Sequence, residues 1–174
     1  IEEAIPLYNQ LIDQNPYSAP YWFGLARCHF EDLNFDQAID ACDYALVGDD
    51  EFTDAYVMKG HCFYQLGNED AALECYQKAE QMHGLAHEFV YTYIGLCKVS
   101  KGEWEEGYEN LEKAIQANEA EETPAPTLPS LYANAGLCLS KMKKKRKAHQ
   151  YCKKAQKLEP KDPEAYLIEG RMYV

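Results

Sequence analysis

The sequence predicts an all-α array of antiparallel helix pairs, and three observations carry this prediction. An aromatic residue followed four positions later by Gly or Ala recurs at steps of 34, 35, 41 and 34 residues. A second series of small residues keeps nearly the same steps. Apolar residues within each unit are spaced three and four apart, as on one face of a helix. The two series are Trp22/Ala26, Tyr56/Gly60, Tyr91/Gly95, Tyr132/Gly136 and Tyr166/Gly170, and Ala4, Ala38, Ala72, Gly107 and Ala148.

A fixed period of this size means that each unit buries its apolar face on its neighbours. In such an array we therefore expect the functional residues to lie on surfaces instead of in pockets. In the unit that begins near Tyr56, one helix precedes Gly67-Asn68 and a second places Ala72 and Ala79 on its inner face. Turn signals separate the helices of each pair and the successive units. They are Leu33-Asn34, Gly67-Asn68, Lys101-Gly102 and Lys143-Lys144 within pairs, and Asn15-Pro16 and Glu159-Pro160 between units.

These signals divide the chain into one array of four full units between two half-units. The predicted bounds are 1–17 (second helix only), 19–52, 53–87, 88–128, 129–162 and 163–174 (first helix only). The first residue is Ile and both ends are half-units, so we expect a piece of a longer protein. Pro6 requires that the first helix begin near Glu2 or kink there.

The 41-residue step adds seven residues to one unit. We expect the preceding helix to extend to about Ala120, followed by a Pro-rich loop near 118–130. Such a loop is either a tolerated surface insertion or a contact for a partner.

The seven cysteines follow the repeat instead of a disulfide or zinc spacing. Four lie six residues after the aromatic mark, and the others follow the small residues by three or four. They are Cys28, Cys62, Cys97 and Cys138, and Cys42, Cys75 and Cys152. This placement favours packing over a redox or metal role, since free cysteine behaves as a small hydrophobe. Unpaired thiols favour a reducing compartment, so we expect the cytoplasm.

Composition indicates a soluble protein, with 47% apolar and 26% charged residues, no membrane-spanning run and no signal peptide. The net charge of −12 divides into −19 for residues 1–140 and +7 for 141–174. A basic run comprises Lys141, Lys143, Lys144, Lys145, Arg146 and Lys147. It is either a solvated turn, a dock for an acidic partner or another copy's acidic end, or a polyanion site or nuclear address. Nucleic-acid binding is disfavoured because the rest of the chain repels phosphate.

No enzyme motif is present: neither a Gly-rich phosphate loop, nor a nucleophile elbow, nor a zinc-protease helix. His83 and His87, with Glu80 and Glu88 nearby, form the one arrangement that resembles a metal site. Gly84 between them favours an exposed turn instead. We therefore expect neither catalysis, nor a metal, nor a cofactor.

The units approximate one order of residues: an aromatic residue, Gly or Ala, a second aromatic residue, two alanines and a proline. This order resembles the tetratricopeptide repeat. The matching residues are Trp22, Leu25, Ala26, Ala38 and Ala45; Tyr56, Gly60, Phe63, Ala72, Tyr76 and Ala79; Tyr91, Ile94, Gly95, Gly107, Leu111 and Ala114; and Tyr132, Gly136, Leu139, Ala148, Ala155 and Pro160. The departures are His29, Lys59, Lys98, Ala135, Glu169 and Gly107.

The resemblance implies a right-handed superhelix whose concave wall, formed by the first helix of each unit, holds a peptide or a partner helix. Carried onto this chain, the groove residues are Phe23, Arg27, Phe30, Val57, His61, Tyr64, Phe89, Thr92, Leu96, Val99, Ala133, Leu137, Ser140, Leu167 and Arg171. Lysine and asparagine, which family members use to clamp a terminal carboxylate, are absent from the corresponding positions Phe23, Arg27, Val57, His61 and Thr92. An apolar wall favours an amphipathic helix or a hydrophobic extended segment.

The sequence therefore predicts a non-enzymatic scaffold that binds a protein or peptide in an apolar concave groove. Alternatively, the same side chains pack between adjacent helices or are covered by another segment of the protein. Two other roles stay open: a structural module that self-associates through its charged ends, and a regulatory segment of a larger multidomain protein.

Overall fold

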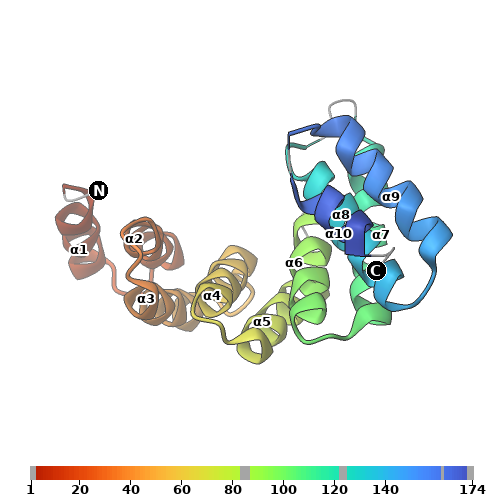
Figure 1. Cartoon of the computed structure of the whole chain (residues 1–174). Coiled ribbons are helices and arrows are strands. Elements are labelled where there is room, and N and C mark those ends of the chain that lie inside the picture. Colours follow the sequence, from red (N-terminus) through yellow and green to blue (C-terminus); the bar gives the residue numbers. More distant parts are fainter. Residues whose placement is uncertain (1–2, 83–86, 122–124, 162, 172–174) are drawn as a thin grey trace. The chain divides into compact units, whose positions relative to one another are not determined.

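The computed structural model describes residues 3–82, 87–121, 125–161 and 163–171 of the 174-residue chain. These residues form ten α-helices in two compact units, residues 1–85 and 86–174. Consecutive helices within each unit run in opposite directions (Figure 1). The expectation of an all-α fold made of sequential helix pairs is confirmed.

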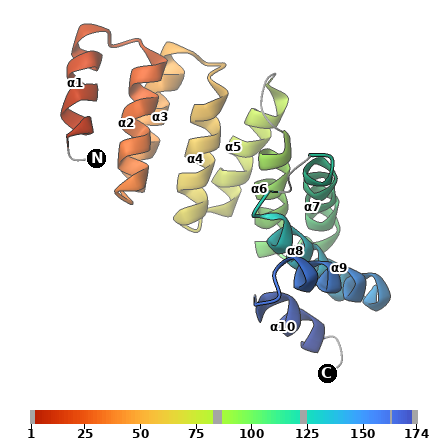
Figure 2. The same ribbon diagram turned by 90° about the horizontal axis from the view of Figure 1, so that it is seen from above.

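Unit 1 contains five helices, two complete pairs preceded by a single helix. Helices α2 and α3 form one pair and α4 and α5 the next, while α3 packs on α4 and α1 packs on α2 (Figure 2). The first helices of the two pairs, α2 and α4, also contact each other. The helices are α1 (Ala4–Gln14), α2 (Ala19–Glu31), α3 (Phe35–Gly48), α4 (Thr53–Gln65) and α5 (Glu69–Gln81).

Unit 2 repeats this arrangement with two pairs followed by a single helix. Helix α6 pairs with α7 and α8 with α9, α7 packs on α8, and α10 contacts both α8 and α9. Helices α6 and α8 also contact each other. The helices are α6 (His87–Ser100), α7 (Trp104–Glu119), α8 (Leu128–Lys141), α9 (Lys145–Leu158) and α10 (Pro163–Arg171).

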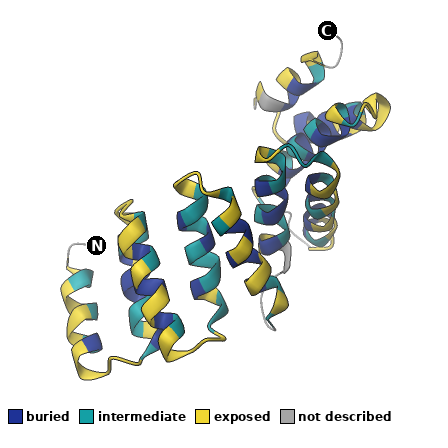
Figure 3. Cartoon of the chain, turned by 90° about the horizontal axis from the view of Figure 1, so that it is seen from below, coloured by how far each residue is buried: buried dark blue, intermediate teal, exposed yellow. Residues whose placement is uncertain are grey.

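Small buried residues let the paired helices approach closely. Ala26, Ala38, Ala72 and Ala148 are completely buried, and the inner faces of the helices form the core of each unit (Figure 3). A Cβ atom at Gly60 would lie 2.7 Å from a ring carbon of Tyr76, closer than packed atoms can come. The periodic small residues are therefore the points at which two helices touch.

The turn inside each helix pair places one residue in the left-handed backbone region. Gly67 and Gly102 occupy this position in two pairs, with φ of 73° and 76°. Leu33 and Lys143 occupy it in the other two, both with φ of 60°. A side chain with a Cβ atom costs about 1–2 kcal/mol in this conformation, and glycine avoids that cost.

Replacing either Leu33 or Lys143 with glycine is therefore expected to stabilise the fold by about 0.5–1 kcal/mol, the relief of backbone strain less the extra entropy of glycine in the unfolded chain. Thermal unfolding followed by circular dichroism measures the effect as a rise in Tm. The reverse change, Gly67→Leu, serves as the control and is expected to lower Tm. A lower Tm for both glycine variants would contradict the assignment.

The Pro-rich interruption is anchored to the helix that precedes it. Helix α7 extends to Glu119, close to the predicted end near Ala120. The side chain of Asn118 is 1% exposed, and its Oδ1 atom accepts a hydrogen bond of 2.9 Å from the backbone N–H of Ala125.

Pro6 lies in the first turn of α1, where its missing N–H leaves no helical hydrogen bond unmade.

All seven cysteines are buried and unpaired, which confirms the packing expectation. Burial raises the pKa of Cys62 and of Cys138 to about 12, and that of Cys152 to about 11. Because the thiolate is the reactive species, these thiols are expected to react with Ellman's reagent at neutral pH about a hundredfold or more slowly than free cysteine. All seven should react at the ordinary rate in urea. Rapid reaction of several thiols in the native chain would refute the packing role.

Candidate partner-binding surface

The first helices of the pairs in unit 1 carry the predicted groove residues on one face. We call the side chains of Phe23, Arg27, Phe30, Val57, His61 and Tyr64 on α2 and α4 the aromatic face. All are half-buried except Arg27, which is exposed. Because α2 and α4 contact each other, the structure brings these residues together within one unit.

Ring contacts join the aromatic face to the core beneath it. The ring of Phe30 lies edge-on to Phe35, with centroids 5.5 Å apart, and 6.4 Å from the ring of His61 on the neighbouring helix. Phe23 lies edge-on to Phe52 at 5.3 Å, just before α4 begins. Aromatic pairs in this geometry add to the energy of burial. The face is therefore held in place by packing, with part of each ring left at the surface.

His61 of the aromatic face has a strongly altered electrostatic environment. Its Nδ1 atom lies 2.8 Å from the hydroxyl oxygen of Tyr76, whose side chain is completely buried in α5. Burial lowers the pKa of His61 to about 4. At neutral pH the imidazole is therefore uncharged, so that Arg27 supplies the positive charge of the aromatic face.

In unit 2 the predicted groove residues divide between core and surface. Leu96, Val99 and Leu137 pack against the core cluster and are half-buried, as are Thr92 and Ser140. Ala133 is completely buried and so adds no contact surface. By contrast, Phe89 and Leu167 are each 57% exposed, and Arg171 is also exposed.

The basic run divides into two parts. Lys141 lies over the ring of Trp104 at 5.6 Å, and Lys147 lies over Tyr108 at 4.8 Å while donating a hydrogen bond of 2.5 Å to its hydroxyl. The other four side chains are exposed and make neither an ion pair nor a ring contact with any part of the chain that the structure describes. They are Lys143, Lys144, Lys145 and Arg146.

Sequence reasoning missed a cluster of tyrosine and lysine side chains on α7, α8 and α9 of unit 2. Lys154 lies over Tyr132 at 4.7 Å and donates a hydrogen bond of 3.0 Å to its hydroxyl. The hydroxyl of Tyr151 donates a hydrogen bond of 2.6 Å to Glu112. Burial is the main cause that raises the pKa of Tyr151. The spacing of Lys147, Tyr151 and Lys154, four and three residues apart on α9, is the signal that marks this shared face.

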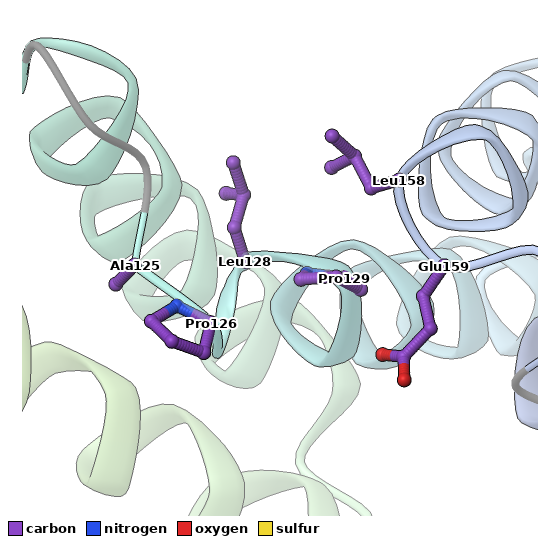
Figure 4. Close-up of a pocket in the computed structure, with 6 residues that line it drawn as sticks. All are labelled: Ala125, Pro126, Leu128, Pro129, Leu158 and Glu159. Atoms are coloured by element: carbon purple, nitrogen blue, oxygen red, sulfur yellow. The ribbon is translucent and has the colours of Figure 1, made fainter.

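A pocket lies where the Pro-rich segment meets the end of α9 (Figure 4). Its walls are apolar apart from one carboxylate, and Leu158 within it is 48% exposed. The lining residues are Ala125, Pro126, Leu128, Pro129, Leu158 and Glu159.

The described residues give no sign of a metal centre or a membrane span. Among residues 3–82, 87–121, 125–161 and 163–171, no three His, Cys, Asp or Glu side chains are grouped to hold an ion. The candidate pair His83 and His87 lies outside the side chains that the structure describes. Within the same ranges, no helix is both long and apolar enough to cross a bilayer.

Comparison with known proteins identifies the repeat. Sequence models of the tetratricopeptide repeat match residues 1–52, 53–82 and 129–162, which together make up most of the chain. The chain belongs to the tetratricopeptide repeat family. Repeats of this family generally mediate interactions between proteins, and they form scaffolds that are typically not catalytic.

Curated relatives of this repeat array are much longer proteins. The chain is 29% identical over 126 residues to the protein CTR9 homolog of Arabidopsis thaliana, covering 67% of this chain and 11% of that protein. It is 22% identical along its whole length to anaphase-promoting complex subunit 3 of Schizosaccharomyces pombe, of which it covers 25%. The chain thus spans about a tenth to a quarter of these two relatives.

Solved structures of tetratricopeptide repeats share the fold. YrrB, described as a protein with an unusual peptide-binding site, superposes with a TM-score of 0.82 at 18% identity, over 95% of this chain and 81% of that one. MamA superposes with a TM-score of 0.77 at 23% identity, over 90% of this chain and 87% of that one. At these identities the likeness establishes the fold alone.

Proposed function

We propose that this tetratricopeptide array is a non-enzymatic scaffold and that the aromatic face of unit 1 binds an apolar helix or extended segment of a partner protein. The half-burial of Phe23, Phe30 and Tyr64 supports the proposal most directly. Aromatic side chains held rigidly by packing, with part of their surface exposed, lose little entropy when a partner covers them. Such residues are the usual energetic centres of protein interfaces.

The charge of this face narrows the class of partner. Arg27 is exposed and makes no ion pair with any residue that the structure describes, whereas His61 is uncharged at neutral pH. A partner segment with apolar side chains and one carboxylate placed to meet Arg27 fits this distribution. A segment that presents only a terminal carboxylate does not, because no lysine or asparagine clamp lies at these positions.

The comparisons agree with a role in protein assembly. YrrB is described as having a peptide-binding site, and one relative is a subunit of the anaphase-promoting complex. We extend to this chain only the general inference that its repeats hold another protein. The partner itself is defined by the chemistry of the aromatic face.

Peptide selection tests the proposal. A phage-displayed library of helical and extended peptides is selected on the parent chain, and each enriched peptide is then measured against an Arg27→Ala, Tyr64→Ala variant. We expect at least a tenfold loss of affinity, since one interface aromatic commonly carries more than the 1.4 kcal/mol that a factor of ten requires.

A Tyr17→Ala variant is the matched control, because Tyr17 is 75% exposed and lies in the turn between α1 and α2, away from the aromatic face. Circular dichroism verifies that both variants keep the helical content of the parent. Peptides that bind the double variant as tightly as the parent would overturn the assignment of this face.

A further inference from the structure

Two turns of the chain place a large exposed side chain where glycine would be more stable. Leu33 and Lys143 are the residues other than glycine with positive φ among those that the structure describes. Leu33 is 72% exposed and Lys143 is also exposed, so neither gains burial in return for the strained backbone. Gly67 and Gly102 hold the same turn position in the other two pairs. The stability of the fold therefore does not account for a large exposed side chain at either position.

Leu33 lines a surface depression that contains both apolar and polar side chains. A pocket between the α2–α3 turn and the end of α4 is lined by Leu33, Phe35 and Leu66 together with polar residues, and Leu66 is 48% exposed. The carboxylate of Asp36 lines the depression, and Glu31 and Asp32 directly precede Leu33 in the chain. All three are exposed and make no ion pair with any residue that the structure describes. We call this the acidic turn surface: Glu31, Asp32, Leu33, Asp36 and Leu66.

Lys143 stands in the opposite kind of surface. Its neighbours along the chain are a half-buried methionine and three exposed cations, and the four cations make no ion pair within the described residues. Helix α9, which follows, carries six basic residues and no acidic one. We call this the basic turn surface: Met142, Lys143, Lys144, Lys145 and Arg146.

The two surfaces complement each other in charge and in apolar content. Unit 1 carries 16 acidic and 3 basic side chains, a net charge of −13, so it offers the carboxylates that the basic turn surface lacks. Methionine adapts readily to irregular apolar surface, such as that of Leu33, Phe35 and Leu66 in the depression. A nucleic acid fits less well, because its phosphates would be repelled by a chain of net charge −12.

We propose that the basic turn surface of one copy docks on the acidic turn surface of a second copy. The two surfaces differ, so the contact is heterologous, and a docked pair keeps one free surface of each kind for further copies. Open chains of copies therefore form as the protein concentration rises. Exposed ion pairs are individually weak and screened by salt, so the association is favoured at low ionic strength.

Sedimentation velocity over a range of concentrations tests the association. At an ionic strength of about 0.01 M, where charges interact over about 30 Å, we expect the weight-average sedimentation coefficient to rise with concentration. At about 1 M, where this distance falls to about 3 Å, we expect the monomer alone. A parent chain that remains monomeric at the lower ionic strength and at high micromolar concentration overturns the proposal.

Charge exchange identifies the surfaces that meet. One variant reverses the basic turn surface with Lys144→Glu and Arg146→Glu, and a second reverses the acidic turn surface with Asp32→Lys and Asp36→Lys. Each variant alone is expected to lose self-association, and an equimolar mixture is expected to recover it. In the mixture the intact acidic turn surface of the first variant meets the intact basic turn surface of the second, and the two reversed surfaces are also complementary in charge. A mixture that stays monomeric therefore contradicts this pairing.

Two further variants separate docking from stability and from total charge. Leu33→Gly removes the exposed leucine while relieving its backbone strain, so it is expected to raise Tm and yet weaken association. Lys157→Glu with Lys161→Glu makes the same charge change on exposed lysines outside the surface, and is expected to associate much more nearly like the parent. Binding of a fluorescent hexaglutamate peptide to a chain that never self-associates would assign the basic turn surface to a foreign acidic partner and overturn the proposal.

Discussion

Lowering the pH from about 7.5 to about 5 is expected to reduce the free energy of unfolding by about 2 kcal/mol through His61 alone. Burial lowers the pKa of His61 from 6.5 to about 4 in the folded chain. Between these values the unfolded chain binds a proton that the folded chain does not, so stability falls as the pH falls. Each unit of difference is worth about 1.4 kcal/mol. The contribution is complete above about pH 6.5 and is lost progressively down to about pH 4.

Urea unfolding of unit 1 measures this effect. The chain contains two tryptophans, Trp22 in unit 1 and Trp104 in unit 2, so a Trp104→Phe background lets fluorescence report on unit 1. In this background the parent is compared with His61→Gln, which keeps a polar side chain that does not titrate. The parent is expected to lose about 2 kcal/mol more than the variant between the two pH values. Parallel pH profiles for the two chains would contradict a neutral buried histidine.

His61 also shows what the sequence could and could not reveal about the aromatic face. Its register, five residues after Tyr56, predicts a position on the first helix of its unit, and the structure places its ring 6.4 Å from that of Phe30. Its uncharged state at neutral pH was not foreseeable from register, because the lowered pKa of His61 results from burial between helices. Periodicity predicts which face a residue occupies, whereas depth and protonation follow from packing.

The same distinction explains the rest of the fold. Helix pairs and turn positions followed from the 34-residue period, and the extended α7 followed from the 41-residue step, since each depends on local pattern. The division into two compact units did not, because it depends on which neighbouring helices exchange contacts. The role of Asn118 was not predictable either. Its buried side chain accepts a hydrogen bond from the backbone of Ala125, but the sequence alone does not distinguish it from other helix residues.

Salt is expected to act differently on the aromatic face and on the two turn surfaces. The face belongs to the first helices of the pairs in unit 1, whereas Leu33 and Lys143 lie in turns between paired helices. The aromatic face offers rigid rings that favour the burial of apolar surface. The turn surfaces offer exposed charges, whose contacts are weak and are screened by salt. High salt is therefore expected to abolish self-association while sparing the binding of an apolar peptide.

Replacing Gly60 with valine is expected to destabilise unit 1 by about 2–3 kcal/mol. The added Cβ atom would lie 2.7 Å from Cε1 of Tyr76 and 2.9 Å from two other ring carbons. The ring is completely buried and its hydroxyl is hydrogen-bonded to His61, so it has no open space into which to rotate. Trp22 fluorescence during urea unfolding, in the Trp104→Phe background, measures the loss.

Gly170 provides a matched control, because it holds the same repeat position on α10 and a Cβ atom there would meet nothing within 4 Å. Gly170→Val is therefore expected to change stability by no more than about 0.5 kcal/mol, measured by urea unfolding of unit 2 through Trp104 in a Trp22→Phe background. Combining Gly60→Val with Tyr76→Ala gives the added methyl groups the volume of the missing ring, so the double variant should lose less stability than the two single changes together. Simple additivity would show that Gly60 and Tyr76 are not in close contact. A large non-additive term would show that this glycine is retained because two helices touch there.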